Sequence, residues 1–348
     1  MKRKWMSHII AILAFVGFIV LGLGSASGPK IAVGEASMLY FNANGGIGAV
    51  PGSETVEKGA SITIPGGEKL SFGDAVFAGW YTISGSTVTN YNAGDSFTPP
   101  GGYITLYAKW ETNDADLDSA IGLANKLVWL QNNAESGGNY IIEINNDETI
   151  ALQTLRYLGK RNITITLRGV EANRVVTSAT ASVNYSTGSN ATLFSVFPGV
   201  TLILDNNITL RGGGKIIDLS GASGEAQGGS LRMNNGSTVS SIPTTRGDTT
   251  RIAVSVGASC TFTMNGGTIS HSGVGVEVWN EARFNMNGGT ISDNNVGVWV
   301  NGWATNTLFT MNNGTITRNN TGVDSERAEN FRSTGGKVSE NRQNIRNQ

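Results

Sequence analysis

The chain has 348 residues, of which 47 are glycine, roughly twice the usual share. Charged residues make up only 15% of the chain and the formal net charge is −1, so there is no electrostatic footprint for nucleic acid or an anionic membrane. With 39% hydrophobic residues a core can form, which excludes global disorder and favours a mainly β protein with Asn/Gly/Thr-rich turns.

The first segment has the order of residues found in an export signal. Lys2, Arg3 and Lys4 precede an apolar stretch at 9–23, and small residues follow at 24–28. This stretch is shorter than the about 20 residues that a membrane-spanning helix needs. We therefore expect a cleaved signal peptide at 1–27, the alternative being an uncleaved anchor, and an exported protein that is extracellular or in the cell envelope or at the cell surface.

The chain has a single cysteine, Cys260, between apolar strand positions. One cysteine cannot form an internal disulfide, so packing and hydrogen bonds must stabilise the fold. We expect this thiol to be buried and inert, with intermolecular pairing as the alternative.

Residues 38–111, after a linker at 28–37, form a compact unit rich in aromatic residues. Strands are expected at 38–41 and 56–65, each ending in a glycine-containing turn. A domain of about 75 residues without disulfides needs a dense aromatic core. The candidate core residues are Phe77, Trp80, Tyr81, Tyr103, Leu106, Tyr107 and Trp110.

Four short motifs follow one another in this unit. They are an aromatic residue ahead of Asn-Gly-Gly at 44–46, Phe-x-Gly-Trp-Tyr at 77–81, Gly94 ahead of Phe97, and Thr-Leu-Tyr-Ala-x-Trp at 105–110. In this order they resemble the Listeria–Bacteroides repeat, also called the internalin B-repeat. The resemblance implies a β-grasp (ubiquitin-like) module of a bacterial surface protein, which is a spacer or binds host or matrix components without enzymatic activity. The family usually carries tandem copies, whereas this chain has one.

Apolar residues at spacings of three and four predict an amphipathic helix from Asp116 to Asn133. Asp116 or Asp118 is available as its N-cap, and Gly137-Gly138 as its stop. Because a solenoid needs capped ends, we expect the helix to cover the first coil of the stack, with Trp129 in the core rather than on a ligand platform.

Near the C-terminus one nine-residue phrase occurs four times, as FTMNGGTIS from Phe262, FNMNGGTIS from Phe284, FTMNNGTIT from Phe309 and FRSTGGKVS from Phe331. The starts lie 22, 25 and 22 residues apart (284−262, 309−284, 331−309). A unit this short cannot bury its own apolar face, so successive coils must stack. Residues 114–348 are therefore expected to form a helix-capped parallel β-helix. Earlier strands are expected at 140–144, 163–167, 193–196, 201–204 and 231–233, with loops at 171–189 and 220–230.

Alignment of the four phrases predicts which side chains point inward. The inward columns are Phe262, Phe284, Phe309 and Phe331; Met264, Met286 and Met311; Ile269, Ile291, Ile316 and Val338; and Val276, Val298, Val323 and Ile345. Asn265, Asn287 and Asn312 precede glycines and should form a ladder of amides at the turn. These repeats resemble the right-handed parallel β-helix of pectin-lyase-like proteins, particularly the Gly/Asn-rich repeats of spirochaetal and other bacterial surface proteins.

Two further columns could carry chemistry. One contains His271, Asp293, Arg318 and Glu340, and the other Glu277, Trp299, Asp324 and Arg346. Acid/base catalysis is one interpretation, since glycosidases use paired carboxylates. We favour a solvated turn in which opposite charges alternate between coils, and we assign no catalytic residue. Calcium nonapeptide repeats and paired-Asp motifs do not occur, so we expect neither a metal nor another cofactor.

Tryptophans cluster on consecutive coils near Glu277. Trp279, Trp299 and Trp303, together with Glu277, are the candidate binding residues for carbohydrate; the alternative is an apolar patch covered by a loop or by the N-terminal unit. The sequence thus predicts an adhesin-like or structural surface protein that binds polysaccharide or a host or matrix protein, and no nucleic acid, without catalysis. A polysaccharide lyase or glycosidase on the same scaffold is the alternative, since a fold does not settle function.

Overall fold

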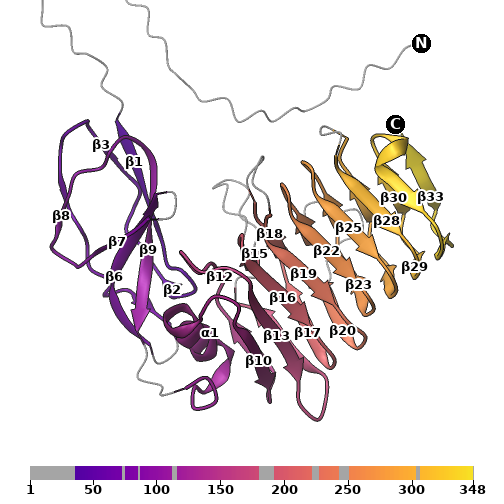
Figure 1. Cartoon of the computed structure of the whole chain (residues 1–348), viewed down its shortest axis with the longest axis horizontal. Coiled ribbons are helices and arrows are strands. Elements are labelled where there is room, and N and C mark those ends of the chain that lie inside the picture. The colour runs from indigo at the N-terminus through magenta and orange to yellow at the C-terminus, as the bar shows by residue number, and fades with distance from the viewer. Residues whose placement is uncertain are drawn as a thin grey trace, which may run out of the picture.

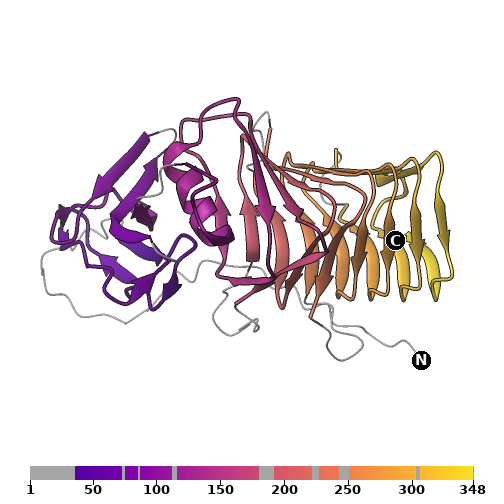
Figure 2. The ribbon, with the colours of Figure 1, turned by 90° about the horizontal axis from the view of Figure 1, so that it is seen from below.

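The computed structural model describes residues 36–347 apart from 73–74, 85–86, 112–115, 180–191, 222–226, 243–250 and 303–305. The expected signal peptide at 1–27 lies outside the described residues. A small β unit is followed by helix α1 (Gly122–Asn133) and then by a long stack of strands (Figure 1). A view turned by 90° shows the helix between the small unit and the first coils of the stack (Figure 2).

The N-terminal unit is built on one five-stranded sheet. Its first and last strands lie parallel at the centre, and the other pairs are antiparallel. The strand order is β3 (Glu54–Val56), β1 (Ser37–Asn42), β9 (Gly102–Glu111), β6 (Val76–Ser84) and β7 (Thr87–Tyr91). Two small antiparallel pairs flank it, β2 (Ile47–Gly48) with β5 (Leu70–Ser71) and β4 (Ile62–Thr63) with β8 (Ser96–Phe97). The single strand expected at 56–65 is therefore wrong, because a turn with Gly59 at φ +80° separates β3 from β4.

Two tryptophans hold the core of this unit together. Trp80 and Trp110 are fully buried, and their indole N–H groups donate to the carbonyls of Pro65 (2.8 Å) and Ala43 (2.9 Å). The ring of Phe77 meets both indoles edge-on, at centroid distances of 5.3 and 5.8 Å. The aromatic motifs thus supply the core, since each buried indole has a backbone partner. Tyr103, which was also expected in this core, is instead exposed.

Helix α1 begins six residues later than the spacing predicts, at Gly122 rather than Asp116. Asp116 instead closes a separate turn, in which its carboxylate accepts from the Ser119 amide at 2.8 Å. The first turn of α1 is capped from outside, because Glu148 accepts from the Leu123 amide at 2.8 Å. The expected capping role is confirmed, since Leu123, Leu127 and Leu130 belong to the solenoid core. The opposite side of α1 packs against the N-terminal unit, where Val128 is part of the core.

The remaining strands form three parallel eight-stranded sheets, which together make a β-helix. The first sheet contains β10 (Asn139–Ile144), β13 (Ile163–Gly169), β16 (Val200–Leu204), β19 (Ser230–Met233), β22 (Thr261–Met264), β25 (Arg283–Met286), β28 (Leu308–Met311) and β31 (Phe331–Ser333). The second contains β11 (Glu148–Ile150), β14 (Arg174–Ser178), β17 (Ile208–Gly212), β20 (Ser237–Ser241), β23 (Thr268–Ser270), β26 (Thr290–Ser292), β29 (Thr315–Thr317) and β32 (Lys337–Ser339). The third contains β12 (Gln153–Leu155), β15 (Thr192–Val196), β18 (Lys215–Leu219), β21 (Ile252–Val256), β24 (Val274–Val278), β27 (Val296–Val300), β30 (Thr321–Ser325) and β33 (Gln343–Asn347).

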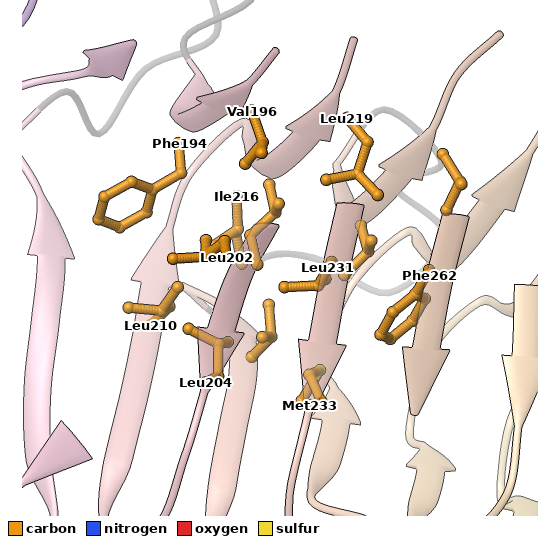
Figure 3. Packing of buried hydrophobic residues seen from close by; sticks show 14 of the residues in the cluster. Phe194, Val196, Leu202, Leu204, Leu210, Ile216, Leu219, Leu231, Met233 and Phe262 are labelled. Atoms are coloured by element: carbon orange, nitrogen blue, oxygen red, sulfur yellow. The ribbon is translucent and has the colours of Figure 1, made fainter. Parts of the chain in front are cut away.

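The interior of the stack is apolar from the first coil to β30. In the last coil Phe331 and Val338 are half-buried, and Ile345, which was expected to point inward, is 45% exposed. Phenylalanines of the repeated phrase stack face to face on successive coils, with centroid distances of 4.6, 4.7 and 5.0 Å, so their inward prediction is confirmed. In the earlier coils, Phe194, Leu202 and Leu231 converge in the same interior (Figure 3). Strand β14 lies inside the segment expected to be a loop at 171–189, so that prediction is wrong in part; the rest of the loop lies mainly outside the described residues.

Two asparagine ladders run along the late coils. The expected one is exposed: Asn287 donates to Asn265 at 3.1 Å, and Asn312 donates to Asn287 at 2.9 Å. The other is buried and was not expected: Asn294 donates to Asn319 at 3.0 Å, and Asn319 to Asn341 at 2.9 Å. At the last coil the side-chain oxygen of Asn344 accepts from the Asn341 amide, in place of an asparagine from a further coil.

Candidate functional site

The outer face of the third sheet carries one side chain per coil in continuous register. We call this row the outer column. It places Glu277 outward because its neighbours Val276 and Val278 fill the interior. The members of the outer column are Thr154, Ser195, Asp218, Ser255, Glu277, Trp299, Asp324 and Arg346.

Polar contacts converge on Ser255 in the middle of the outer column. Its hydroxyl donates to a carboxylate oxygen of Glu277 at 3.0 Å and accepts from the Lys215 ammonium and the Trp279 indole N–H, both at 3.3 Å. Burial raises the pKa of Glu277 above its ordinary value, while Lys215 and the Ser255 hydrogen bond oppose the rise. The site therefore holds a largely desolvated carboxyl group beside an indole.

Both other carboxylates of the outer column have cationic partners. Lys215 contacts Asp218 at 3.0 Å, and Arg346 binds Asp324 with its Nε at 2.9 Å. Sequence reasoning missed Lys215 and Asp218, because the early coils lack the repeated phrase that fixes the register. The signal that could have found Asp218 is its place between Ile217 and Leu219, both buried, since alternation along the strand then turns it outward. Alternation alone does not place Lys215 beside it, because the two residues are an odd number of positions apart.

The structure brings three of the four expected binding residues to one face. Trp299 pairs in register with Glu277 on the preceding coil and with Asp324 on the following one, and it is half-buried. Trp279 follows the end of β24, is 39% exposed, and reaches back toward Ser255. Trp303 lies outside the described residues. Two indoles thus lie on either side of Glu277.

The second charged column lies at a turn rather than on a strand face. His271, Asp293, Arg318 and Glu340 all have left-handed backbones, with φ between 55° and 60°. Arg318 forms a two-pronged ion pair with Asp293, at 3.0 and 2.8 Å, which holds the pKa of that carboxyl below its usual value. Such an exposed pair contributes little to stability. The geometry is that of a solvated turn.

The N-terminal unit has an assignable family. Residues 38–109 match the family model of the Listeria-Bacteroides repeat domain. No curated protein and no solved structure matches the chain. The match covers the five-stranded sheet and stops before α1, so the repeat resemblance is confirmed for this unit alone. The pectin-lyase-like resemblance of the β-helix stays a prediction.

The Listeria-Bacteroides repeat is typical of bacterial surface and extracellular proteins. In the part of the chain that the structure describes, no helix is long and apolar enough to cross a membrane. Over the same residues, His, Cys, Asp and Glu side chains do not gather into a group that could hold a metal ion.

Proposed function

We propose that the protein is an exported, adhesin-like protein of the bacterial cell surface or envelope, which binds a polysaccharide along the outer column without cleaving it. The Listeria-Bacteroides repeat supports the location. The observation that carries the binding proposal is the arrangement of Trp279 and Trp299 on either side of Glu277.

This arrangement suits the chemistry of a sugar. An indole face can pack against the apolar face of a sugar ring, while the polar edge of the indole stays in contact with water. Half-exposed tryptophans are suited to such contacts, because they combine an apolar ring with a polar N–H group. The carboxyl group of Glu277 offers hydrogen-bond acceptors to sugar hydroxyls. Because the strands repeat every ~4.8 Å along the stack, the outer-column side chains that reach the surface follow one line, which suits a linear polymer. Ser255 and Asp324 are buried beneath their neighbours and support this line from below.

The pairing of the carboxylates supports binding over catalysis. Asp218 is neutralised by Lys215 and Asp324 by Arg346, and Glu277 is held by the Ser255 hydroxyl. General acid/base catalysis requires a proton donor and an acceptor that face the scissile bond. Because these carboxylates are already bound to partners, the sheet face is better suited to holding a ligand than to transferring protons to it.

One observation favours glycoside hydrolysis as a second candidate. Asp218 and Glu277 lie two coils apart in the outer column, with Ser255 between them. Two strand spacings separate the backbones of these residues by about 9.6 Å, close to the about 6.5–9.5 Å that lies between the two carboxyl groups of inverting glycosidases. The raised pKa of Glu277 is the direction expected of a general acid.

The deciding experiment is a binding screen of the whole protein on a glycan array and on purified matrix proteins. Trp299→Ala and Trp279→Ala should each weaken glycan binding about tenfold or more. Tyr103→Ala is the matched control, since this aromatic side chain is 79% exposed on the N-terminal unit and should leave binding unchanged. Unchanged binding in both tryptophan variants would remove the outer column as the site, and capture of a matrix protein alone would replace the polysaccharide.

The two candidates are separated by the fate of the bound glycan. Under the binding proposal, prolonged incubation yields no shortened chains, and Glu277→Gln alters affinity only. Release of oligosaccharides by the native protein, abolished by Glu277→Gln or Asp218→Asn, would establish hydrolysis instead.

A further inference from the structure

A cleft of about 180 Å³ lies where the N-terminal unit meets α1 and the first coil. Tyr81 of β6 and Lys109 of β9 line it from the N-terminal unit, Gln131 and Asn132 from the end of α1, and residues 156–160 from the chain after β12. It is separate from the outer column that carries the proposed function. Three separate parts of the chain thus contribute to one concave surface.

Hydrogen bonds hold these walls in place. The side-chain nitrogen of Asn44 donates to the Ala108 carbonyl at 2.9 Å, and its second N–H is shared between the Tyr81 hydroxyl at 3.2 Å and the Gln131 side-chain oxygen at 3.4 Å. Across the junction, Asn132 donates to the Trp110 carbonyl at 3.2 Å. The cleft is therefore preformed, which lowers the entropic cost of binding a ligand.

The described residues that line the cleft include cations and no carboxylate. Its charged residues are Lys109, Arg156 and Lys160. Lys160 donates to the Ala134 carbonyl, which leaves other N–H groups of its ammonium free. Lys109 pairs with the exposed carboxylate of Glu111, a weak contact that a ligand can replace.

Arg156 is the central cation of this group. The central carbon of its guanidinium lies over the ring of Phe197, 4.7 Å from the ring centre, so a cation–π contact fixes the position of this side chain. Over the described ranges no hydrogen bond or ion pair occupies those N–H groups. An arginine fixed in this way is prepared to bind a carboxylate with two parallel hydrogen bonds.

Neutral groups complete the lining. Burial raises the pKa of Tyr81 to about 12, with a smaller rise from Tyr107, against the opposing effect of Arg156. The hydroxyl therefore keeps its proton at neutral pH and can donate it. The ring of Tyr81 also stacks on that of Tyr107, at a centroid distance of 5.5 Å. Asn90 and Asn132 add amide groups that can bind hydroxyls.

We propose that this cleft binds a single acidic sugar unit, with its carboxylate on Arg156 and the two lysines and its hydroxyls on the amides and Tyr81. The volume lies below the about 300 Å³ at which drug-sized sites begin, so the cleft has room for one sugar ring, and further units of a longer ligand would lie outside it. The three lining cations favour a ligand with negative charge, and the lining amides favour one with hydroxyl groups.

The test is a titration of the whole protein with glucuronate, glucose and inorganic sulfate, in which binding is measured by calorimetry or by ligand-observed NMR. Glucuronate should bind with a dissociation constant in about the millimolar range, as expected for a ligand of this size. Arg156→Ala should weaken this binding about tenfold or more, and Arg156→Lys should weaken it less. Arg232→Ala is the matched control, because this arginine is exposed on β19 of the first sheet and should not affect binding.

The ligands and variants make each outcome decisive. Glucose binding as tight as that of glucuronate overturns the role of the cations, and sulfate binding as tight as that of glucuronate overturns the assignment to a sugar. An Arg156→Ala protein that melts like the native one and still binds glucuronate fully overturns the site. If Arg156→Ala lowers the melting temperature, Lys109→Ala on the exposed side serves instead, with a severalfold loss of affinity expected and no loss overturning the site. Because Trp279 and Trp299 lie elsewhere, loss of polysaccharide binding in their variants leaves this test unaffected.

Discussion

Replacing Asn319 with alanine should cost far more stability than replacing Asn287, although both are ladder asparagines in neighbouring coils. Asn319 is 3% exposed. Its side-chain nitrogen contacts the carbonyls of Ile291 (3.1 Å) and Thr317 (3.0 Å) and the side-chain oxygen of Asn341 (2.9 Å). Its oxygen accepts from the backbone and the side-chain nitrogens of Asn294, both at 3.0 Å.

The magnitude follows from the number of groups left without partners. Asn319→Ala leaves buried donors and acceptors on the coils above and below without hydrogen-bond partners. We therefore expect the free energy of unfolding to fall by about 3 to 5 kcal/mol. Asn287 is exposed and has two ladder bonds, at 3.1 and 2.9 Å. Water replaces those partners, so Asn287→Ala should cost about 1 kcal/mol or less.

Hydrogen exchange measured by mass spectrometry can resolve the difference locally. In a stacked solenoid each coil is held by its neighbours, so the loss at Asn319 should appear in β26, β29 and β32 and leave the N-terminal unit unaffected. A loss of about 3 kcal/mol corresponds to opening about 100-fold more often. Equal exchange in Asn319→Ala and Asn287→Ala would refute the reasoning that burial, rather than the amide ladder itself, sets the contribution.

Three further outcomes are expected. Phe284→Ala should lower the free energy of unfolding by about 4 kcal/mol, because this fully buried ring stacks on a ring on each side. Phe331→Ala should lower it clearly less, because this ring has one stacked neighbour, and urea unfolding measures both values. Glu277 binds its proton more tightly when folded, so stability should fall as pH rises from 4.5 through its raised pKa, and Glu277→Gln should abolish that fall in melting curves. Asp293 has a lowered pKa, so its pair with Arg318 stabilises above pH 3.8 and weakens as pH falls through the folded pKa. Because the pair is exposed, Arg318→Ala should change the acid limb of stability only slightly but should raise the pKa of Asp293 measured by NMR, and an unchanged pKa contradicts the pairing.

The late coils could be predicted from the sequence because the repeated phrase fixes their register. Once Phe262 and Phe284 are aligned, strand alternation determines which neighbours point inward, and the stacked rings confirm it. The buried ladder was missed for a physical reason. Asn294 and Asn287 have the same side chain and similar spacing, and only the path of the turn decides which of them is enclosed.

The early coils and the junction could not be predicted in the same way. Lys215 and Asp218 belong to a coil without the phrase, so their position beside Ser255 depends on pairing across coils of unequal length. The start of α1 was misplaced because Glu148, which caps it, comes from a strand that follows the helix in the sequence. Local patterns carry no information about such long-range caps.

The same limit explains why the cationic cleft was invisible in the sequence. Lys109 lies in the Listeria-Bacteroides repeat and Arg156 after the first coil, and each alone is an ordinary surface cation. They face one cleft because α1 packs on both units, with Leu127 in one core and Val128 in the other. A helix expected only to cap the solenoid therefore also fixes the position of the repeat. Variants that loosen α1 should consequently affect ligand binding at the cleft before they affect the outer column, which depends on coil stacking alone.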